Sequence, residues 1–228
     1  MESFPILGRF FCFIQIEINM KKIYIIVCLL LLSACASVKF KDKWLTKQAP
    51  ETFKARFETT QGNFDILAKR EWSPAGVDRL YQLINREYYQ DIAIFRVVPK
   101  FVAQFGIHND TVINNAWGKK GIIDEPVLKK NKKMTVAFAR GGVKTRSNQI
   151  FINLKDNYRL DTLAYSGVTG FPVVAVVVDG KENVLKFYNG YGDKLGYKQD
   201  SISKFGNTFL RKKYPKVDYI IKAYILKD

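Results

Sequence analysis

The sequence predicts a mainly β domain in which short strands form a barrel or a sandwich and two helices cover it. Strands are indicated by many short apolar runs separated by clusters of Gly, Asn, Asp and Lys. Only two segments, 74–86 and 181–188, have a pattern that favours a helix. A barrel is consistent with this pattern because closure would remove exposed strand edges, at which chains otherwise associate.

The first elements are predicted to be a hairpin followed by a helix. Apolar and polar residues alternate over 53–59 and again over 64–68, and the turn sequence 60–63 separates the two runs. Ser73 followed by Pro74 is typical of a helix start, since proline is tolerated in the first turn. The apolar residues that then recur at helical spacing are Val77, Leu80, Tyr81 and Ile84.

The remainder of the chain is predicted to supply further strands and the second helix. The helix at about 181–188 ends before Asn189 and Gly190, which favour a turn. No internal repeat is visible, so we expect one domain over residues 53–227. The expected strands are 92–98, 101–105, 134–139, 149–153, 173–178 and 218–226.

The composition indicates a basic globular domain without a cofactor. The chain has 228 residues, of which 37 are Lys or Arg and 21 are Asp or Glu, for a net charge of +16. The single histidine, His108, excludes a His-rich metal site and is expected to be structural or exposed. All three cysteines lie in the first 35 residues, which excludes a disulfide framework or a cysteine-based zinc site in the body of the chain. The basic residues are not interleaved with aromatics, so we expect a solvated surface that can meet anionic lipid headgroups, and no nucleic-acid partner.

The N-terminal segment resembles the signal peptide of a bacterial lipoprotein. Two lysines after Met20, an apolar run over 23–32 and small residues before Cys35 make up the pattern. We therefore expect a signal peptide over 20–34, a lipid on Cys35 and a polar tether over 35–52, with residues 1–19 resulting from a misassigned start site. Such a protein would be held at a membrane of the bacterial cell envelope, facing the periplasm. An uncleaved anchor or a buried cytosolic segment is the alternative.

Three motifs carry information about function. The pattern F-R-x-x-P-x-F-x-x-Q covers residues 95–104, S-x-Q-x-F-I-N covers 147–153, and Leu160-Asp161 follows. Their order and spacing resemble those of cyclophilin-type peptidyl-prolyl cis-trans isomerases, particularly bacterial members, over roughly residues 55–195. The resemblance implies a closed antiparallel barrel of about eight strands capped by two helices. It also implies no metal or cofactor, and proline-containing chains as partners; we expect a monomer, because nothing in the sequence indicates an obligate subunit.

Prolyl isomerisation explains why an arginine and an apolar pocket would suffice. The partial double bond of a peptide unit sets a rotation barrier of about 18–20 kcal/mol. No covalent bond breaks, so the catalyst only has to stabilise the twisted amide, and a guanidinium can do so by donating to the prolyl nitrogen. The resemblance implies this role for Arg96, in an enzyme that assists the folding of exported proteins.

The resemblance also implies which residues bind the substrate. Phe101 and Phe151 match aromatic residues that line the pocket for the proline ring, and Leu160 matches the aliphatic wall of that pocket. Gln104 matches a glutamine that binds the substrate backbone, and Gln149 matches one near the adjoining pocket.

Five positions depart from the family pattern. Val102 replaces a methionine in the proline pocket, and Phe171 replaces a histidine. Phe138 replaces a small alanine, which would narrow the neighbouring pocket, and Ala139 replaces a backbone-binding asparagine. Arg159 replaces a tryptophan that supports cyclosporin binding in eukaryotic members. These changes bear on drug sensitivity and on the residues preferred beside proline, whereas the arginine is kept.

Two other functions stay open at this point. A binding module of the same fold would hold proline-containing segments without turnover, and a barrel that carries a small apolar ligand would enclose a cavity. Arg96 separates the first of these from the enzyme, because binding alone requires no donor aimed at the amide nitrogen. Taken singly, Arg96 would be read as a surface salt bridge and the aromatic residues as core, and only the combined motif favours the isomerase.

Overall fold

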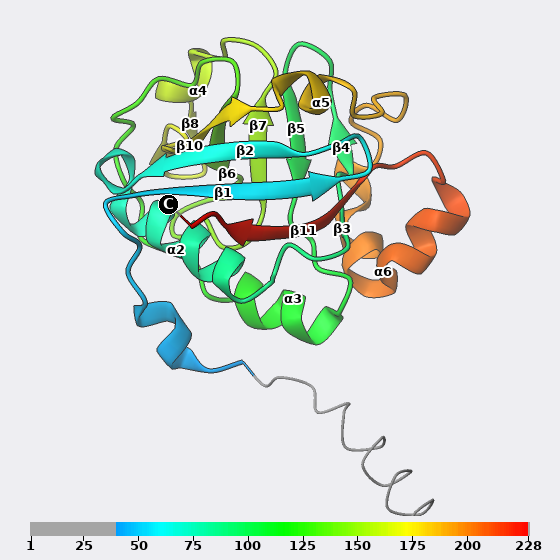
Figure 1. The fold of residues 1–228 in the computed structure, drawn as a ribbon, viewed down its shortest axis with the longest axis horizontal. Helices are drawn as coiled ribbons and strands as arrows, with labels where there is room; N and C mark the ends of the chain where they lie inside the picture. Colours follow the sequence, from blue (N-terminus) through cyan, green and yellow to red (C-terminus); the bar gives the residue numbers. More distant parts are fainter. Residues whose placement is uncertain (1–39, 228) are drawn as a thin grey trace, which may run out of the picture. The chain divides into compact units, whose positions relative to one another are not determined.

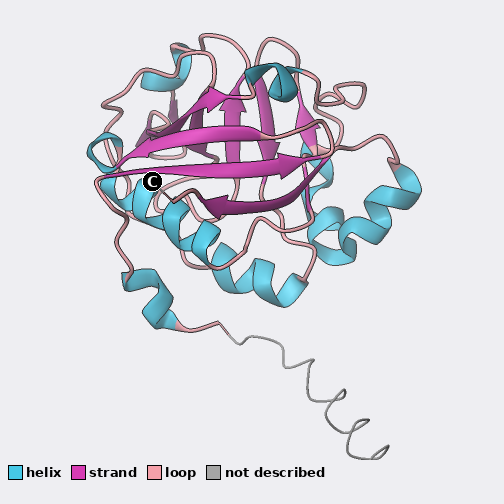
Figure 2. Ribbon diagram, viewed as in Figure 1, coloured by secondary structure: helices cyan, strands magenta, loops and turns pink. Residues whose placement is uncertain are grey.

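A computed structural model describes residues 40–227, and a curled antiparallel sheet is its main feature (Figures 1 and 2). The sheet has nine strands in the order β3-β11-β1-β2-β10-β6-β7-β5-β4, and β8 and β9 form a separate hairpin. The strands are β1 (Thr52–Thr59), β2 (Phe64–Lys69), β3 (Ile92–Ala93), β4 (Arg96–Val97), β5 (Val102–Phe105), β6 (Thr135–Phe138), β7 (Ile150–Asn153), β8 (Ala164–Tyr165), β9 (Val168–Thr169), β10 (Val173–Asp179) and β11 (Tyr219–Ile225).

The predicted strands are confirmed, with one instructive difference. The run 92–98 was expected to be one strand, but it divides into β3 and β4, separated by Ile94 and Phe95. The Ile94 amide donates to the carbonyl of Asp218 at 2.8 Å, whereas Arg96 pairs with Gln104 on the opposite edge of the sheet. This segment therefore leaves one edge of the sheet and joins the other.

The expectation of a closed barrel is corrected by the same observation. β3 and β4 are the two edge strands, and within residues 40–227 no ladder joins them. The sheet is thus a strongly curled half-barrel whose edges are connected by two residues of the chain rather than by hydrogen bonds. Because the run 92–98 forms two strands, the main sheet has nine strands and not the expected eight or so.

The helices are more numerous than the two that the sequence predicts. They are α2 (Pro74–Asn85), α3 (Thr111–Gly118), α4 (Arg159–Thr162), α5 (Lys181–Leu185) and α6 (Gln199–Lys213), with short 3-10 turns η2 (Asp42–Thr46), η3 (Arg70–Trp72) and η4 (Gly196–Lys198). The predicted helix 74–86 is confirmed as α2, and the predicted 181–188 is the shorter α5. α6 is kinked at Gly206, whose φ of 59° is left-handed, and this break disguises its helical pattern.

The start of α2 is capped from a distant part of the chain. The Ser73 side chain makes no capping bond to its own helix. Instead, the Glu125 carboxylate accepts from the amides of Ala75 at 2.8 Å and Gly76 at 3.1 Å, and it pairs with the fully buried Arg146 at 2.9 Å. A carboxylate at the positive end of a helix satisfies amides that otherwise lack partners. This contact ties the start of α2 to the loops that contain Glu125 and Arg146.

The segment before β1 contacts the domain through Trp44. Trp44 is 9% exposed, and its ring lies 5.5 Å from that of Phe40 and 6.3 Å from that of Trp117. Within the described part of the expected tether, Trp44 and Ala49 are buried and the other residues are partly or fully exposed. The expected start-site error, the signal peptide and Cys35 lie outside the described residues. Among residues 40–227, no helix is both long enough and apolar enough to cross a bilayer.

Candidate active site

The F-R-x-x-P-x-F-x-x-Q motif forms the hairpin of β4 and β5. Its turn contains Pro99 and Lys100, which has a left-handed φ of 58°. The Val98 amide donates to the carbonyl of Val102 at 2.8 Å and so continues the pairing toward the turn. Arg96 and Gln104 stand directly opposite each other in this ladder. The Nη1 atom of Arg96 donates to Oε1 of Gln104 at 3.1 Å, so the motif brings its two polar residues together.

An apolar cluster lies beside this pair. Phe151 faces Gln104 across the ladder of β5 and β7, and the Arg96 guanidinium carbon lies 5.4 Å from the centre of the Phe101 ring. Phe151 is 5% exposed and Leu160 is 6% exposed. The buried members of the cluster are Val102, Ala137, Phe151 and Leu160, and the partly buried ones are Phe101, Ala139, Leu163 and Phe171. The structure thus brings together the predicted arginine and the predicted walls of the proline pocket.

Side-chain amides continue from Arg96 in a hydrogen-bonded row. Gln104 donates to Gln149 at 3.0 Å, and Gln149 donates to Gln199 at 3.0 Å. Gln104 is 6% exposed, so its neighbours leave its side chain few accessible rotamers. The three glutamines also line a hollow of about 220 Å³, together with residues that include Ala139 and Thr145. This hollow lies next to the apolar cluster, where the adjoining pocket was predicted beside Gln149.

A buried network of polar side chains lies beside the apolar cluster. Asn131 and Asn153 are fully buried, and the Asn153 amide donates to Oδ1 of Asn131 at 3.0 Å and to the Thr135 hydroxyl at 2.9 Å. Asn131 in turn donates to the carbonyl of Phe171 and to Asp161, both at 2.9 Å. The asparagine of the F-I-N motif and the aspartate after Leu160 are therefore structural residues, and their network binds the backbone of Phe171 in the apolar cluster.

Two residues of the site were not foreseen from the sequence. Asp193 accepts a hydrogen bond from Nε of Arg96 at 2.5 Å, and Gln199 ends the amide row. Both lie after α5, in a stretch for which no element was predicted. Because the contact between Arg96 and Asp193 spans 97 positions, no local pattern could reveal it.

Four of the residues that depart from the family pattern have surroundings that bear on their expected roles. Phe138 has no exposed surface and belongs to the main core, so it does not narrow the neighbouring pocket as expected. The centre of the Phe171 ring lies 5.8 Å from that of the Phe151 ring. The guanidinium carbon of Arg140 lies 4.3 Å from the centre of the Phe171 ring. Val102 is 2% exposed and contributes a covered part of the wall. Arg159 is exposed at the start of α4.

His108 takes no part in this site. It lies in the loop before α3, where its Nδ1 atom accepts from the Asp110 amide at 2.9 Å and its ring is 5.1 Å from that of Tyr88. Burial lowers the pKa of His108, against a smaller opposing effect of Asp110. Among the residues that the structure describes, no group of three His, Cys, Asp or Glu side chains is placed to hold a metal.

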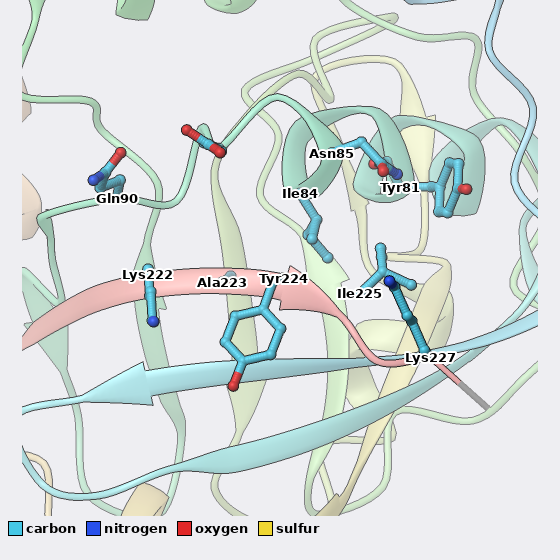
Figure 3. A pocket seen from close by; sticks show the side chains of 10 residues that line it. Tyr81, Ile84, Asn85, Gln90, Lys222, Ala223, Tyr224, Ile225 and Lys227 are labelled. Carbon is cyan, nitrogen blue, oxygen red and sulfur yellow. The ribbon is translucent and has the colours of Figure 1, made fainter.

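Another hollow lies elsewhere, between α2 and β11 (Figure 3). Its volume is about 710 Å³, and it is lined by residues such as Tyr81 and Ile84 on α2 and Lys222 and Tyr224 on β11. It contains none of the predicted site residues. Arg96 and the apolar cluster are therefore identified by their chemistry and not by the size of the depression.

Comparisons with known proteins identify the family and the fold. The family described as cyclophilin type peptidyl-prolyl cis-trans isomerase/CLD matches residues 54–206. Peptidyl-prolyl cis-trans isomerase A of Dickeya dadantii is 26% identical over 147 residues, which cover 64% of this chain and 76% of that protein. Peptidyl-prolyl cis-trans isomerase-like 2 of Aspergillus oryzae is 31% identical over 101 residues, 43% of this chain but only 18% of that longer protein.

A solved structure shows the same fold. The cyclophilin type peptidyl-prolyl cis-trans isomerase of Cryptosporidium parvum superposes with a TM-score of 0.53 and 16% sequence identity, over 78% of this chain and 99% of that one. The family match extends over more than half of the sequence and includes all three motifs. The chain therefore belongs to the family of cyclophilin-type peptidyl-prolyl cis-trans isomerases.

Proposed function

We propose that the protein catalyses cis–trans isomerisation of peptide bonds that precede proline. The observation that carries this proposal is the position of Arg96, whose guanidinium lies between Gln104 and the Phe101 ring at the edge of the apolar cluster. The cluster offers a place for a pyrrolidine ring, and the arginine offers a donor at the bond to be rotated. The Cryptosporidium neighbour has also been solved in the presence of the dipeptide Ala-Pro.

The mechanism follows from the hydrogen-bonding capacity of Arg96. A guanidinium has five N–H donors. Nε donates to Asp193 and one Nη1 hydrogen to Gln104, and within residues 40–227 no acceptor is bound to Nη2. The free donors can bind the prolyl nitrogen as its lone pair leaves the amide resonance. That interaction exists only in the twisted state, so it lowers the barrier rather than merely tightening binding.

The size of this effect is sufficient for a catalyst. Each 1.36 kcal/mol of selective stabilisation changes a rate about tenfold, so an acceleration of ~10⁵ requires about 7 kcal/mol. A charged donor in a partly water-excluded site can supply several kcal/mol of this, and the apolar pocket supplies orientation. No nucleophile or redox group is required, because no covalent bond is made or broken.

The test is the isomerisation of a short proline-containing peptide by the purified protein. Exchange spectroscopy by NMR measures the interconversion of the two isomers at equilibrium without a coupling protease. We expect exchange that is much faster than the uncatalysed process, which takes tens of seconds or longer. A peptide that binds while its exchange stays at the uncatalysed rate would favour the binding-module alternative.

We also propose that the clients are exported proteins and that the enzyme is anchored by a lipid on Cys35. The support is the basic, apolar and small-residue order of segments before that cysteine. Intact-mass analysis of the protein from cells tests this, since a mature chain beginning with a lipidated Cys35 is expected. Any other N-terminus would remove the proposed anchor without affecting the proposed chemistry.

A further inference from the structure

The stretch from the end of α5 to the first residue of α6, residues 186–199, contacts the candidate site at three points. Asp193 binds Arg96, Gln199 binds Gln149, and Gly196 packs against the Arg96 side chain. A Cβ atom at Gly196 would lie 3.1 Å from Cδ of Arg96 and 3.4 Å from its Nε. The absence of a side chain at this position therefore lets the segment approach the arginine closely.

The segment is itself held in place. Leu195 has no exposed surface and packs in a second apolar cluster that includes Phe95, the residue before Arg96. The Gly196 amide donates to the carbonyl of Asp193 at 2.8 Å, and the Gly192 amide donates to that of Asn189 at 3.0 Å. Asp193 is thus fixed from both sides by local turns and anchored by a buried neighbour.

The two hydrogen bonds of Arg96 together determine how its guanidinium lies. Asp193 accepts from Nε at 2.5 Å, and Gln104 accepts from Nη1 at 3.1 Å. Two acceptors on different nitrogens of one planar group prevent it from turning about the bond between Cδ and Nε. The side chain of Arg96 is 23% exposed and that of Asp193 is 46% exposed, so the ion pair itself contributes little to folding stability. Its main effect is on orientation.

We propose that Asp193 is a positioning residue that aims the free Nη2 donors of Arg96 at the prolyl amide. This inference rests on the proposed isomerase function. An arginine side chain loses considerable rotamer freedom when it is held in one geometry. If Asp193 has already removed that freedom, none of the loss falls on the step that reaches the twisted amide. For this orientation, the oxygen of Asp193 that accepts from Nε matters more than the negative charge of its carboxylate.

The test compares four forms of the full-length protein by NMR exchange over a range of peptide concentrations, which gives both kcat and KM. Asp193→Ala removes the acceptor, and Asp193→Asn keeps an oxygen that can accept from Nε. Asp200→Ala is the matched control, because Asp200 is exposed nearby and makes no ion pair within residues 40–227. We expect Asp193→Ala to lower kcat about tenfold with little change in KM, and Asp193→Asn to keep activity within about threefold of the wild type.

A second measurement reports on orientation without requiring activity. The Nε–Hε resonance of Arg96 should exchange slowly with solvent in the wild type and in Asp193→Asn, and rapidly in Asp193→Ala. An unchanged or raised kcat in Asp193→Ala overturns the positioning role, as does equal loss in the Asn and Ala variants. An inactive wild type overturns the proposed function instead, and the Arg96 resonance then still shows whether Asp193 holds the guanidinium.

Discussion

Arg96 and Gln104 are directly opposed in the ladder of β4 and β5, and a hydrogen bond of 3.1 Å joins their side chains on one face of that hairpin. Side chains opposite each other in an antiparallel pair lie close together by geometry alone. The hairpin alone therefore places the Arg96 guanidinium next to the Gln104 amide that orients it. Phe151, opposite Gln104 on β7, places the apolar cluster next to the same pair.

Replacement of Phe151 by leucine is expected to weaken substrate binding. The shorter side chain leaves part of the apolar cluster empty and removes the aromatic contact with Phe171 at 5.8 Å. We expect KM to rise several-fold while kcat changes less, because the lost contact serves the ground state and the twisted state alike. Titration of a proline peptide by NMR measures the change in affinity.

Phe138→Leu is the matched control for this prediction. Phe138 faces Ile150 in the ladder of β6 and β7 but belongs to the main core. The Phe138→Leu substitution should lower the free energy of unfolding by about 1–2 kcal/mol and leave KM unchanged. Equal effects of the two variants on KM would mean that the apolar cluster is not the substrate pocket.

Asn153→Ala is expected to destabilise the domain strongly. Its amide donates to Asn131 and Thr135, and its Oδ1 accepts from Asn157 at 2.7 Å. Removal leaves buried polar groups without partners, and each such group costs about 1–3 kcal/mol. Urea unfolding should show a loss of about 2–4 kcal/mol.

Asn85→Ala provides the comparison for the buried asparagine. Asn85 is exposed at the end of α2, and its side chain donates only to the carbonyl of Tyr81 within the same helix. A surface change of this kind should alter the free energy of unfolding by less than about 0.5 kcal/mol. Similar losses in both variants would show that the buried network does not support the pocket wall.

The stability of the domain should fall in mildly acidic solution because of His108. Burial lowers the pKa of this imidazole in the folded protein, whereas the unfolded chain binds the same proton near pH 6.5. The unfolded state therefore holds more protons as the pH drops below about 6.5, and the free energy of unfolding decreases until the folded-state pKa is passed. Urea unfolding between pH 8 and 5 measures this slope.

His108→Gln isolates the contribution of the imidazole, because the chain contains no other histidine. The variant should show a flatter dependence of unfolding free energy on pH above the range in which carboxyl groups titrate. Identical slopes in the two proteins would exclude His108 as the cause.

The local parts of the fold could be predicted from the sequence, and the long-range parts could not. The hairpin of β1 and β2 and the helix α2 follow from alternation, turn residues and a proline at a helix start. The division of 92–98 into β3 and β4 depends on where each half finds its partner, which is decided by β11 and β5. For α3, Asp110 is a local signal that could have been used, since its carboxylate caps the amides of Val112 and Ile113.

The candidate site shows the same distinction. Arg96, Phe101 and Gln104 lie in one motif, so their proximity follows from a hairpin. Asp193 and Gln199 come from a polar segment whose position is set by the burial of Leu195, and no spacing rule connects it with β4. Phe138 lies in the main core, whereas its neighbours Ala137 and Ala139 pack in the apolar cluster, because alternate residues of a strand point to opposite faces.

The most direct test of the account is the isomerase activity of Arg96→Ala beside that of Arg96→Lys and the wild type. Arg96 is partly exposed, so both variants should stay folded, which circular dichroism can verify. We predict that alanine lowers kcat/KM by about a hundredfold or more, and that lysine recovers little because a single ammonium cannot bind Gln104, Asp193 and the prolyl amide in one plane. An alanine variant that isomerises the peptide as fast as the wild type would contradict the assignment of Arg96 as the catalytic residue.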